Sequence, residues 1–548
     1  MWSDLLRVLG LWRARTGWLA LGCAVAAVST LLGVALLALA GRGVASALGG
    51  AAFGGGMALL LLRPLVLLRP AARWVERMLT HAATFRALAD TRVWFFRRLA
   101  DRLPAGIGLR RSGDLLGRLV ADVEALDGLY LRTIVPGAAA LVVVLAVALL
   151  LGAAPALAVI VALPLALALL LPLLLAPAAA RAAGDIALAQ GGLRAAAADS
   201  FIGIEDTLAA NAEARAGAAL AREGSALAVA QRGLAWRGAL AGAAGSLLVQ
   251  AALLGALGWG LAAGSPGTAL AVLALFLAAA AAEPLGIMPR AGAALAAAAA
   301  GARRLFEAAD APPPVVEPAK PAEEPEGYAI RFEGVEFAWA PDRPPVFEGL
   351  DLEIPEGTRL ALLGPSGIGK SSFAALLLKL AAPQAGRITL GGVDIAALPA
   401  EFVRRRIACL TQDARLFDDS IAANLRIAAP LAPDAALWRA LDRAGIGELV
   451  RALPEGLATQ CGEGGARFSG GQARRLALAR VLLSAAPVLI LDEPTAGLDA
   501  ETERAFLETL EEVTAGRTVI LVTHRLTGVE RPTRILRLAG GRALPAAG

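Results

Sequence analysis

The eight residues from Gly364 to Ser371 have the types and spacing of a phosphate-binding loop. They read Gly364, Pro365, Ser366, Gly367, Ile368, Gly369, Lys370 and Ser371, with Ser372 next. Glycines let consecutive backbone N–H groups curl around phosphate oxygens, the lysine reaches the β- and γ-phosphates, and the serine hydroxyl ligates Mg²⁺. Lysine occurs at only three positions, 320, 370 and 379, and arginine takes almost every other basic position. A lysine at 370 therefore argues against a glycine-rich turn that matches by chance.

A second candidate site is the apolar run Val488–Leu491, which is followed by Asp492 and Glu493. Asp492 is suited to the Mg²⁺ shell, and Glu493 can polarise the water that attacks a γ-phosphate. By itself, an apolar strand that ends in Asp-Glu is more often structural than catalytic. The phosphate-binding loop lies about 120 residues earlier, however, and phosphoryl transfer needs a phosphate cradle, a metal ligand and an oriented water. Together, the two segments predict hydrolysis of a nucleoside triphosphate with Mg²⁺.

These segments are expected to lie in an α/β domain that covers residues 328–548. Strand-like runs at 358–363, 488–492 and 518–523 alternate with helical runs, which is typical of a largely parallel sheet. Ligands of such sheets bind at the carboxyl ends of the strands, where the phosphate-binding loop and Asp492 would both lie. Residues 307–327 precede this domain and are rich in proline and glutamate, so they are predicted to form an extended linker.

Residues 1–306 have the composition of a membrane domain. The chain of 548 residues is 57% apolar and only 18% charged, which is too apolar for a wholly soluble protein. Six stretches are long and apolar enough to cross a bilayer as helices: 17–40, 53–79, 133–153, 155–178, 236–263 and 268–300. Residues 1–15 carry apolar side chains at helical spacing, which predicts a helix that lies along the membrane interface.

The positive charge of the chain indicates membrane lipid rather than a nucleic acid as its partner. The net charge is +5, but the arginines concentrate beside the apolar stretches, above all in 92–125 and 179–235. Those connections are expected to face the cytoplasm together with both termini, while the short uncharged connections face outward. The connections at 80–132 and 179–235 are too long for turns, so the helices are predicted to continue into the cytoplasm and return. The three cysteines lie far apart, without the spacing of a disulfide framework or a zinc site.

A third segment, at residues 468–472, identifies the kind of ATPase that the chain resembles. It reads Phe-Ser-Gly-Gly-Gln and is similar to the LSGGQ signature that is peculiar to ABC ATPases, with Phe468 in place of the usual leucine. In that family two nucleotide domains close head to tail, and ATP lies between the phosphate-binding loop of one and the signature of the other. The resemblance implies that Ser469, Gly470, Gly471 and Gln472 contact the nucleotide of a partner subunit. The chain carries one such domain, so it would have to dimerise to work.

The other parts of the ABC ATPase pattern can be placed residue by residue. Trp339, in Phe-Ala-Trp-Ala, matches the aromatic that stacks on adenine, with an ordinary strand residue as the alternative. Gln412 resembles the glutamine that touches Mg²⁺, and Asp499 lies in a segment similar to the D-loop, which would contact the partner's nucleotide. His524 is similar to the switch histidine that contacts the γ-phosphate. The implied catalytic residues are Glu493, His524 and Gln412, and the implied Mg²⁺ ligands are Ser371, Gln412 and Asp492.

A narrower resemblance runs through most of the chain. Residues 73–86, 116–136 and 523–530 are similar to segments of the CydC family. That family implies a type 1 ABC exporter-like fold, with an α-helical membrane domain of six transmembrane helices followed by an α/β P-loop ATPase domain. Its members pair with a CydD-type half-transporter in the bacterial inner membrane and serve cytochrome bd assembly. They are associated with export of cysteine and glutathione, and also with binding and moving haem. The resemblance leaves a homodimer open and does not decide between thiol and haem as cargo.

A basic stripe in the second predicted span bears on the cargo. Arg69, Arg73, Arg77 and His81 are spaced by four, so on a helix they drift by about 40° per step. Charge at that depth usually lines a polar cavity or pathway, and an anionic small molecule such as glutathione or haem would suit it. Snorkelling of Arg69 and Arg73 to lipid headgroups is the competing interpretation. His81 is the only histidine of the membrane half and a candidate haem ligand, with Arg77 as a propionate partner; a structural role is the alternative.

Two classes of function compete on the sequence alone. The first is a transport enzyme in which ATP binding closes a dimer, the helix bundle opens outward, and hydrolysis resets it. Helical extensions near residues 100–120 and 199–215 would carry that coupling. The second is a non-transporting regulator in which ATP only switches conformation. Glu493 and His524 weigh against it, because a pure switch could dispense with turnover. An importer is disfavoured, since importers usually keep their membrane and ATPase parts on separate chains.

Overall fold

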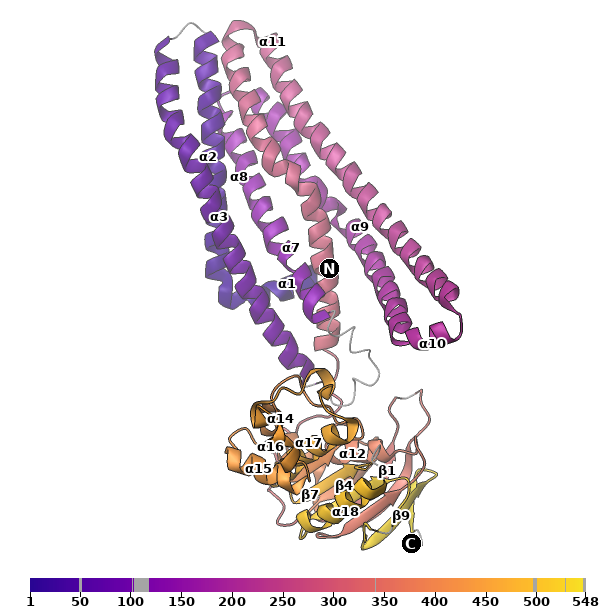
Figure 1. Cartoon of the computed structure of the whole chain (residues 1–548). Coiled ribbons are helices and arrows are strands. Elements are labelled where there is room, and N and C mark those ends of the chain that lie inside the picture. The colour runs from indigo at the N-terminus through magenta and orange to yellow at the C-terminus, as the bar shows by residue number, and fades with distance from the viewer. Residues whose placement is uncertain are drawn as a thin grey trace. The chain divides into compact units, whose positions relative to one another are not determined.

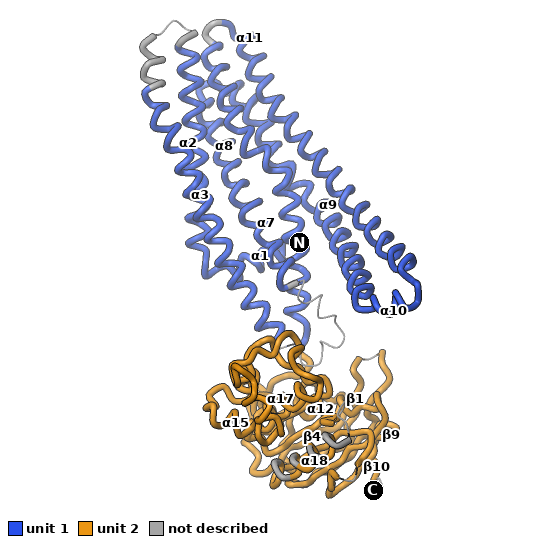
Figure 2. The backbone as a smooth tube through the Cα atoms, viewed as in Figure 1, with its two compact units in different colours: residues 1–102, 107–312 blue, residues 103–106, 313–548 orange. Residues whose placement is uncertain are grey.

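The structure is a computed structural model that describes residues 1–48, 52–100, 102, 118–340, 342–495, 500–527 and 529–545. The described residues divide into two compact units, those up to Pro312 and those from Pro313 onward (Figure 2). Each unit has its own hydrophobic core, so each is described by itself.

The described part of the first unit is helical throughout (Figure 1). Alanine and leucine dominate its sequence, and both are strong helix formers. Its longer elements are α1 (Trp2–Leu11), α2 (Thr16–Leu48), α3 (Ala52–Ala100), α8 (Val135–Leu150), α9 (Pro155–Ile202), α10 (Ile204–Ala209) and α11 (Glu213–Ala309). Its short helical turns are η1 (Trp12–Arg15), η3 (Arg118–Asp122), α6 (Val123–Ala125), α7 (Asp127–Leu129) and η4 (Tyr130–Ile134).

Five helical stretches among the described residues are long and apolar enough to cross a membrane. They are Trp2–Ser46, Leu119–Leu150, Pro155–Ile202, Glu213–Gly264 and Gly267–Ala309. The last two are both parts of α11, which changes direction at Gly264, where φ is +68°. Only glycine adopts that backbone angle without strain.

The second predicted span, 53–79, differs from the other five. It lies in α3, a continuous helix of 49 residues, but it is absent from the five stretches found among the described residues. This part of α3 carries Arg63, Arg69, Arg73, Glu76 and Arg77.

The long connections continue the helices, as the sequence predicts. Residues 179–202 extend α9, residues 213–235 begin α11, and α10 joins them at the far tip (Figure 1). In the other long connection, at 80–132, α3 continues to Ala100. The predicted coupling segment near 100–120 lies largely outside the described residues.

The first helix packs on protein. Leu5, Val8 and Trp12 are buried in the core of the first unit, and the indole N–H of Trp12 donates to Oγ1 of Thr91 at 2.9 Å. Trp2 remains exposed. The predicted amphipathic helix thus forms over α1 and η1, but much of its apolar face is covered by the rest of the unit.

The second unit consists of two sheets with helices around them. The strands are β1 (Ile330–Phe337), β2 (Phe347–Ile354), β3 (Arg359–Leu363), β4 (Ala385–Leu390), β5 (Val393–Asp394), β6 (Ile407–Leu410), β7 (Val488–Asp492), β8 (Thr518–Thr523), β9 (Arg534–Ala539) and β10 (Arg542–Pro545). One sheet has the order β2-β1-β4-β5 and is antiparallel, and the other has the order β10-β9-β3-β8-β7-β6 and is parallel except for β9–β10.

The helices of the second unit are α12 (Lys370–Leu377), α13 (Ala400–Arg406), α14 (Ile421–Arg426), α15 (Asp434–Arg443), α16 (Gly447–Ala452), α17 (Gly470–Leu483) and α18 (Ala500–Val513). Short turns lie at η5 (Ile395–Ala397), η6 (Gly456–Ala458) and η7 (Glu463–Gly465). The parallel sheet brings the candidate chemistry to one edge, because β3, β8 and β7 are neighbours that run the same way. Leu363 pairs with Thr523, and Asp492 pairs with Val522, so the segments that follow these strands meet.

Most of the predicted linker at 307–327 lies in the second unit. Its first three residues complete α11, which ends at Ala309. Further along, the Glu317 carboxylate accepts from the backbone N–H of Ala400 at 3.1 Å and lies 3.7 Å from Nζ of Lys379. The backbone N–H of Ala322 donates to the carbonyl of Ala397 at 3.0 Å. These contacts fix this proline-rich segment to the surface of the second unit.

Candidate functional site

The phosphate-binding loop joins β3 to α12 in the parallel sheet. Gly367 and Gly369 have φ of +83° and +111°, and a Cβ on Gly369 would lie 2.5 Å from Val346. Both positions therefore require glycine. The Lys370 side chain is buried at the start of α12, and its Nζ donates to the carbonyl of Gly364 at 2.8 Å. The loop thus folds around its own lysine, as a phosphate cradle does.

The two sequence-predicted segments meet at this loop. Nζ of Lys370 lies 3.4 Å from Oε1 of Glu493, and the hydroxyl of Ser371 donates to Oδ2 of Asp492 at 3.3 Å. The members of the first pair are 123 positions apart in the sequence, and those of the second pair are 121 positions apart. All four residues therefore share one site. The geometry brings together the cradle, the proposed metal ligand and the proposed general base.

Asp492 has a buried carboxylate oxygen, Oδ1, without a hydrogen-bond partner among the described residues, as a candidate metal ligand would. Burial raises the pKa of this carboxyl above its usual value, and the nearby charge of Glu493 raises it further. No cluster of three or more His, Cys, Asp or Glu suited to a metal was found in the described segments. A carboxylate beside one serine hydroxyl suits Mg²⁺, which is usually held by one or two protein groups together with substrate phosphates.

Glu493 is held by its backbone in an unusual conformation. Its φ is +45°, which is uncommon for a residue with a side chain, and its N–H donates to the carbonyl of Val522 at 2.8 Å. The side chain is largely buried, and Nδ1 of His524 lies 3.9 Å from its Oε1. His524 is itself exposed, so its ring can reach outward from the same edge.

Trp339 and Gln412 lie differently with respect to the loop. The indole N–H of Trp339 donates to Oγ of Ser372 at 2.9 Å, and the ring packs edge-on against Phe337. Its indole therefore lies beside the phosphate loop. Gln412 is exposed, and the contact recorded for it is through its backbone carbonyl rather than its side chain. Asp499, the D-loop residue, lies outside the described residues.

The signature segment forms the start of α17. Ser469 is the N-cap: its hydroxyl accepts from the N–H of Gln472 at 3.3 Å, and the Gln472 side chain accepts from the N–H of Ser469 at 3.0 Å. This reciprocal capping box fixes both side chains. Gly470 and Gly471 form the first turn of a 14-residue helix, whose N-terminal end carries a partial positive charge.

Arg474 is a residue of this site that the sequence analysis did not identify. Its guanidinium donates to the carbonyls of Gln412 and Pro494, each at 2.9 Å, and to that of Asp492 at 2.8 Å. It also contacts the carbonyl of Glu493. Burial lowers the pKa of Arg474, although nearby carboxylates oppose that shift. One side chain of α17 therefore holds the backbone on both sides of the two candidate carboxylates, Asp492 and Glu493.

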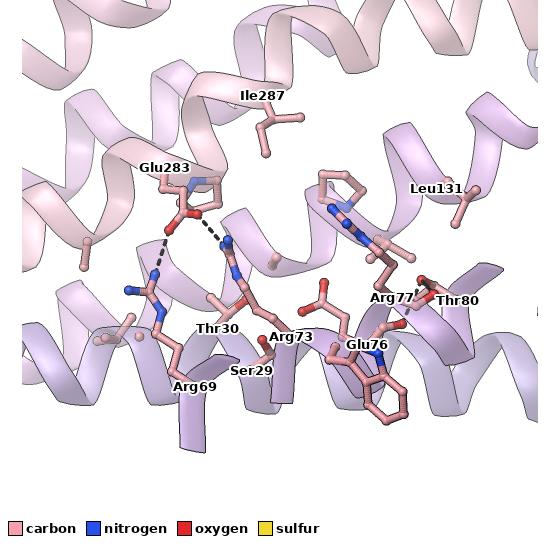
Figure 3. A pocket seen from close by; sticks show the side chains of 18 of the residues that line it. Ser29, Thr30, Arg69, Arg73, Glu76, Arg77, Thr80, Leu131, Glu283 and Ile287 are labelled. Atoms are coloured by element: carbon pink, nitrogen blue, oxygen red, sulfur yellow. Dashed lines mark hydrogen bonds and ion pairs between the residues drawn. The ribbon is translucent and has the colours of Figure 1, made fainter. Parts of the chain in front are cut away.

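The first unit contains a cavity of about 800 Å³, which we call the arginine cavity (Figure 3). Its lining includes five arginines: Arg69, Arg73, Arg77, Arg132 and Arg290. It also includes Glu76, Glu283 and His81, so positive charge is in excess. The predicted stripe of Arg69, Arg73, Arg77 and His81 thus lines this cavity.

Glu283 of α11 is the second residue that sequence reasoning missed. Arg69 Nη2 donates to its Oε2 at 2.7 Å, and Arg73 contacts its Oε1 (Figure 3). Glu76, which follows Arg73 by three residues, has no ion pair recorded within the described ranges. The stripe is therefore neutralised across helices rather than along its own helix. A signal was present, because Glu283 is the one carboxylate in the predicted span 268–300, where the other charged residue is Arg290.

His81 is oriented by the turn that precedes it. Its Nδ1 lies 3.0 Å from the carbonyl of Arg77, and its ring meets Phe85 edge-on at 6.0 Å. The Arg77 side chain has no carboxylate partner recorded in the part of the chain that the structure describes. Both side chains line the arginine cavity.

Comparison with known proteins extends these observations. A family model described as an ABC transporter matches residues 347–496, and one described as an AAA domain of a type IV TA system matches residues 466–527. The chain is 34% identical to the "Glutathione/L-cysteine transport system ATP-binding/permease protein CydC" of Escherichia coli (strain K12), over 98% of this chain and 96% of that protein. It is 40% identical to the ATP-dependent lipid A-core flippase of Chromohalobacter salexigens, over 39% of this chain and 37% of the flippase.

The structure is similar to that of a bacterial Atm1-family ABC exporter with ATP bound. The TM-score is 0.85 at 26% sequence identity, over 97% of this chain and 94% of the exporter. These similarities confirm the predicted fold class, a helical membrane-type domain followed by an α/β ATPase domain. They also confirm an ATPase that is coupled to transport in a multi-pass membrane protein. The CydC similarity spans the whole chain, whereas the flippase similarity covers about two fifths of it.

Proposed function

Because this chain belongs to the CydC family of ABC exporter half-transporters, we propose that it uses ATP to export glutathione or cysteine from the cytoplasm. The export would cross the bacterial inner membrane and support cytochrome bd assembly. By the positive-inside rule, the arginine-rich connections would face the cytoplasm, together with both termini. The observation that carries the proposal is an arginine-lined cavity in the same chain as an assembled ATPase site.

In the ATPase reaction, Lys370 and the loop from Gly364 to Ser372 would bind the phosphates of ATP. Ser371, Asp492 and Gln412 would hold Mg²⁺, which neutralises charge on the β- and γ-phosphates when bound. Glu493 would orient the attacking water and accept its proton, with His524 beside the γ-phosphate. Trp339 would stack on adenine next to the loop that it contacts through Ser372.

The second half of each ATP site would come from a partner subunit. Ser469, Gly470, Gly471 and Gln472 lie at the N-terminus of α17, where the helix dipole favours an anion. Together with Asp499 they would contact the partner's ATP. A CydD-type half-transporter is the proposed partner, since the relative that matches over the whole chain is named CydC, and a second copy of the chain is the alternative.

The arginine cavity supports an anionic cargo. Glutathione carries two carboxylates, and five arginines against two glutamates provide the charge to bind them. Partly hydrated charges inside a helix bundle are costly unless they serve a pathway or a site. A cavity of this size accommodates a tripeptide.

Haem is a second candidate cargo, because His81 lines the same cavity as the arginines. Its Nδ1 is engaged by the carbonyl of Arg77, and no partner of Nε2 is recorded among the described residues. The purified complex is mixed with haem, and its visible absorption spectrum is compared with that of a His81→Ala variant. A Soret band that the substitution shifts would favour haem, and an unchanged band would remove His81 as its ligand.

Vesicles containing the full chain and its partner test the proposal. ATP and glutathione are added to inside-out vesicles, and glutathione accumulation is measured for the wild type and for Glu493→Gln. The wild type is expected to accumulate glutathione, while the variant binds ATP but sustains no transport. Equal accumulation by both proteins would contradict coupled hydrolysis and favour a regulator. No accumulation by an ATP-hydrolysing wild type would remove glutathione as cargo.

A further inference from the structure

The arginine cavity contains its own anion. The carboxylate of Glu283 in α11 accepts from the guanidinium groups of both Arg69 and Arg73, which lie on successive turns of α3 (Figure 3). We propose that Glu283 is an internal counter-ion that a carboxylate of the cargo displaces. When the cargo carboxylate replaces Glu283 on the arginines, the ion pairs that join α11 to α3 are lost in the same step. This inference rests on the proposed function, because it specifies how the same cavity selects its cargo.

The cost of unpaired charge inside a membrane domain favours such an exchange. An arginine without a partner is costly inside a membrane domain, and so is a lone glutamate. Pairing them lowers both costs while the cavity holds no cargo. An incoming carboxylate replaces one ion pair on the arginines with another, whereas a neutral solute leaves Glu283 and the arginines no better paired. The exchange therefore selects anions.

The cavity leaves space for the Arg69 guanidinium, and it holds two further arginines that a cargo can contact. A Cβ on Gly33 of α2 would lie 3.2 Å from Nε of Arg69, so glycine provides the space for that guanidinium. Arg77 and Arg290 line the cavity too, and no carboxylate partner is recorded for either in the described part of the chain. A cargo with two carboxylates can thus displace Glu283 with one and contact these arginines with the other.

The opposite role for Glu283 makes the opposite prediction. Glutathione and cysteine both carry an ammonium group, which a glutamate can bind directly. If Glu283 binds that ammonium, neutralising it weakens cargo binding. If it competes for the arginines, neutralising it strengthens cargo binding. The sign of the change decides between the two roles.

The first test measures glutathione-stimulated ATP hydrolysis by the full chain and its partner subunit in nanodiscs. Glu283→Gln is expected to lower the half-maximal glutathione concentration by about tenfold, because the cargo no longer competes with an internal anion. Glu76→Gln is the matched control, since it removes the same charge from the same cavity without breaking a recorded ion pair. An unchanged or raised concentration in Glu283→Gln would overturn the proposal. So would an equal decrease in Glu76→Gln, which would indicate a general effect of charge.

The second test needs no glutathione and separates this inference from the proposed function. Thermal unfolding is measured for Arg73→Gln, Glu283→Gln and the double variant. The loss in Tm of the double variant should be smaller than the sum of the single losses, because the two residues form one pair. Saturating succinate, a plain dicarboxylate, should abolish that coupling. Additive losses, or coupling that persists with succinate, would overturn the exchange whether or not glutathione is the cargo.

Discussion

Lys370 and Glu493 form an ion pair at the edge of the parallel sheet, with Nζ 3.4 Å from Oε1. Both side chains are largely buried, and the lysine also donates to the carbonyl of Gly364. The ammonium is therefore held at the point where the loop and the strand β7 meet. A γ-phosphate bound in the loop would lie between Lys370, its proposed ligand, and Glu493, the proposed base.

Lys370→Met is expected to abolish ATP binding, because the ammonium is the main positive charge that reaches the β- and γ-phosphates. Lys370→Arg should fail as well, since the side chain is buried in the loop and a guanidinium is too wide for the space. Binding of a fluorescent ATP analogue and ATP hydrolysis measure both effects. Lys320→Arg is the control, because Lys320 is exposed in the proline-rich segment. Hydrolysis by Lys370→Arg near the wild-type rate would contradict this account of the loop.

Asp492 is expected to give stability a specific dependence on pH. Burial raises its pKa above the unfolded value, so the folded chain binds this proton more tightly than the unfolded chain. The cost of the buried charge is present in full above the raised pKa, and it disappears as the pH falls toward the unfolded value. Asp492→Asn should therefore raise the Tm without nucleotide at about pH 8, with a gain that shrinks toward about pH 4.

Mg·ATP should reverse the order of stability of these two proteins. It stabilises the wild type by mass action and should leave Asp492→Asn almost unchanged, because the carboxylate is the proposed metal ligand. Differential scanning fluorimetry across the pH range, with and without Mg·ATP, measures both effects. A gain for Asp492→Asn that grows as the pH falls would show that burial does not control this carboxyl.

Arg474→Ala is expected to lower kcat for ATP hydrolysis by roughly 10- to 100-fold with little change in KM. The guanidinium holds the carbonyls of Asp492, Glu493 and Pro494, so its loss should let the carboxylates drift from the reacting groups. Arg474→Lys should rescue only part of the rate, because an ammonium cannot span these carbonyls. Arg475→Ala is the matched control, since Arg475 donates to the carbonyl of Gly445 instead. Equal losses of kcat in both alanine variants would indicate a general loss of folding.

The parts of this molecule that the sequence predicts are those with local patterns. The phosphate-binding loop, the Asp-Glu pair and the signature each depend on a few adjacent residues whose backbone conformation and chemistry are set by type and spacing. Their meeting in space follows from one further rule, that parallel strands place their carboxyl ends at the same edge. Ser371 and Asp492 can therefore be assigned to one site from residue types and strand order alone.

Long-range partners could not be predicted in this way. Glu283 is 214 positions from Arg69, and nothing in either neighbourhood indicates which helix faces α3. Arg474 donates to backbone carbonyls, which every residue has, so its partners leave no trace in side-chain types. The first helix shows a related limit. Its apolar stripe suits lipid and protein equally, and tertiary packing decides that Leu5 and Trp12 are buried.

Gly33→Ala tests the space that α2 leaves for Arg69. Alanine in a helix is more stable than glycine by about 1 kcal/mol, so Gly137→Ala in α8, where a Cβ would meet nothing within 4 Å, should raise the Tm. Gly33→Ala should not, because its methyl group would lie 3.2 Å from Nε of Arg69 and push the guanidinium away from Glu283. In a Glu283→Gln background the arginine has no ion pair to lose, so Gly33→Ala should recover the gain. The Tm is measured for Gly33→Ala, Gly137→Ala, Glu283→Gln and the double variant Gly33→Ala/Glu283→Gln. An equal gain in Tm for Gly33→Ala and Gly137→Ala in the wild-type background would show that Arg69 moves freely.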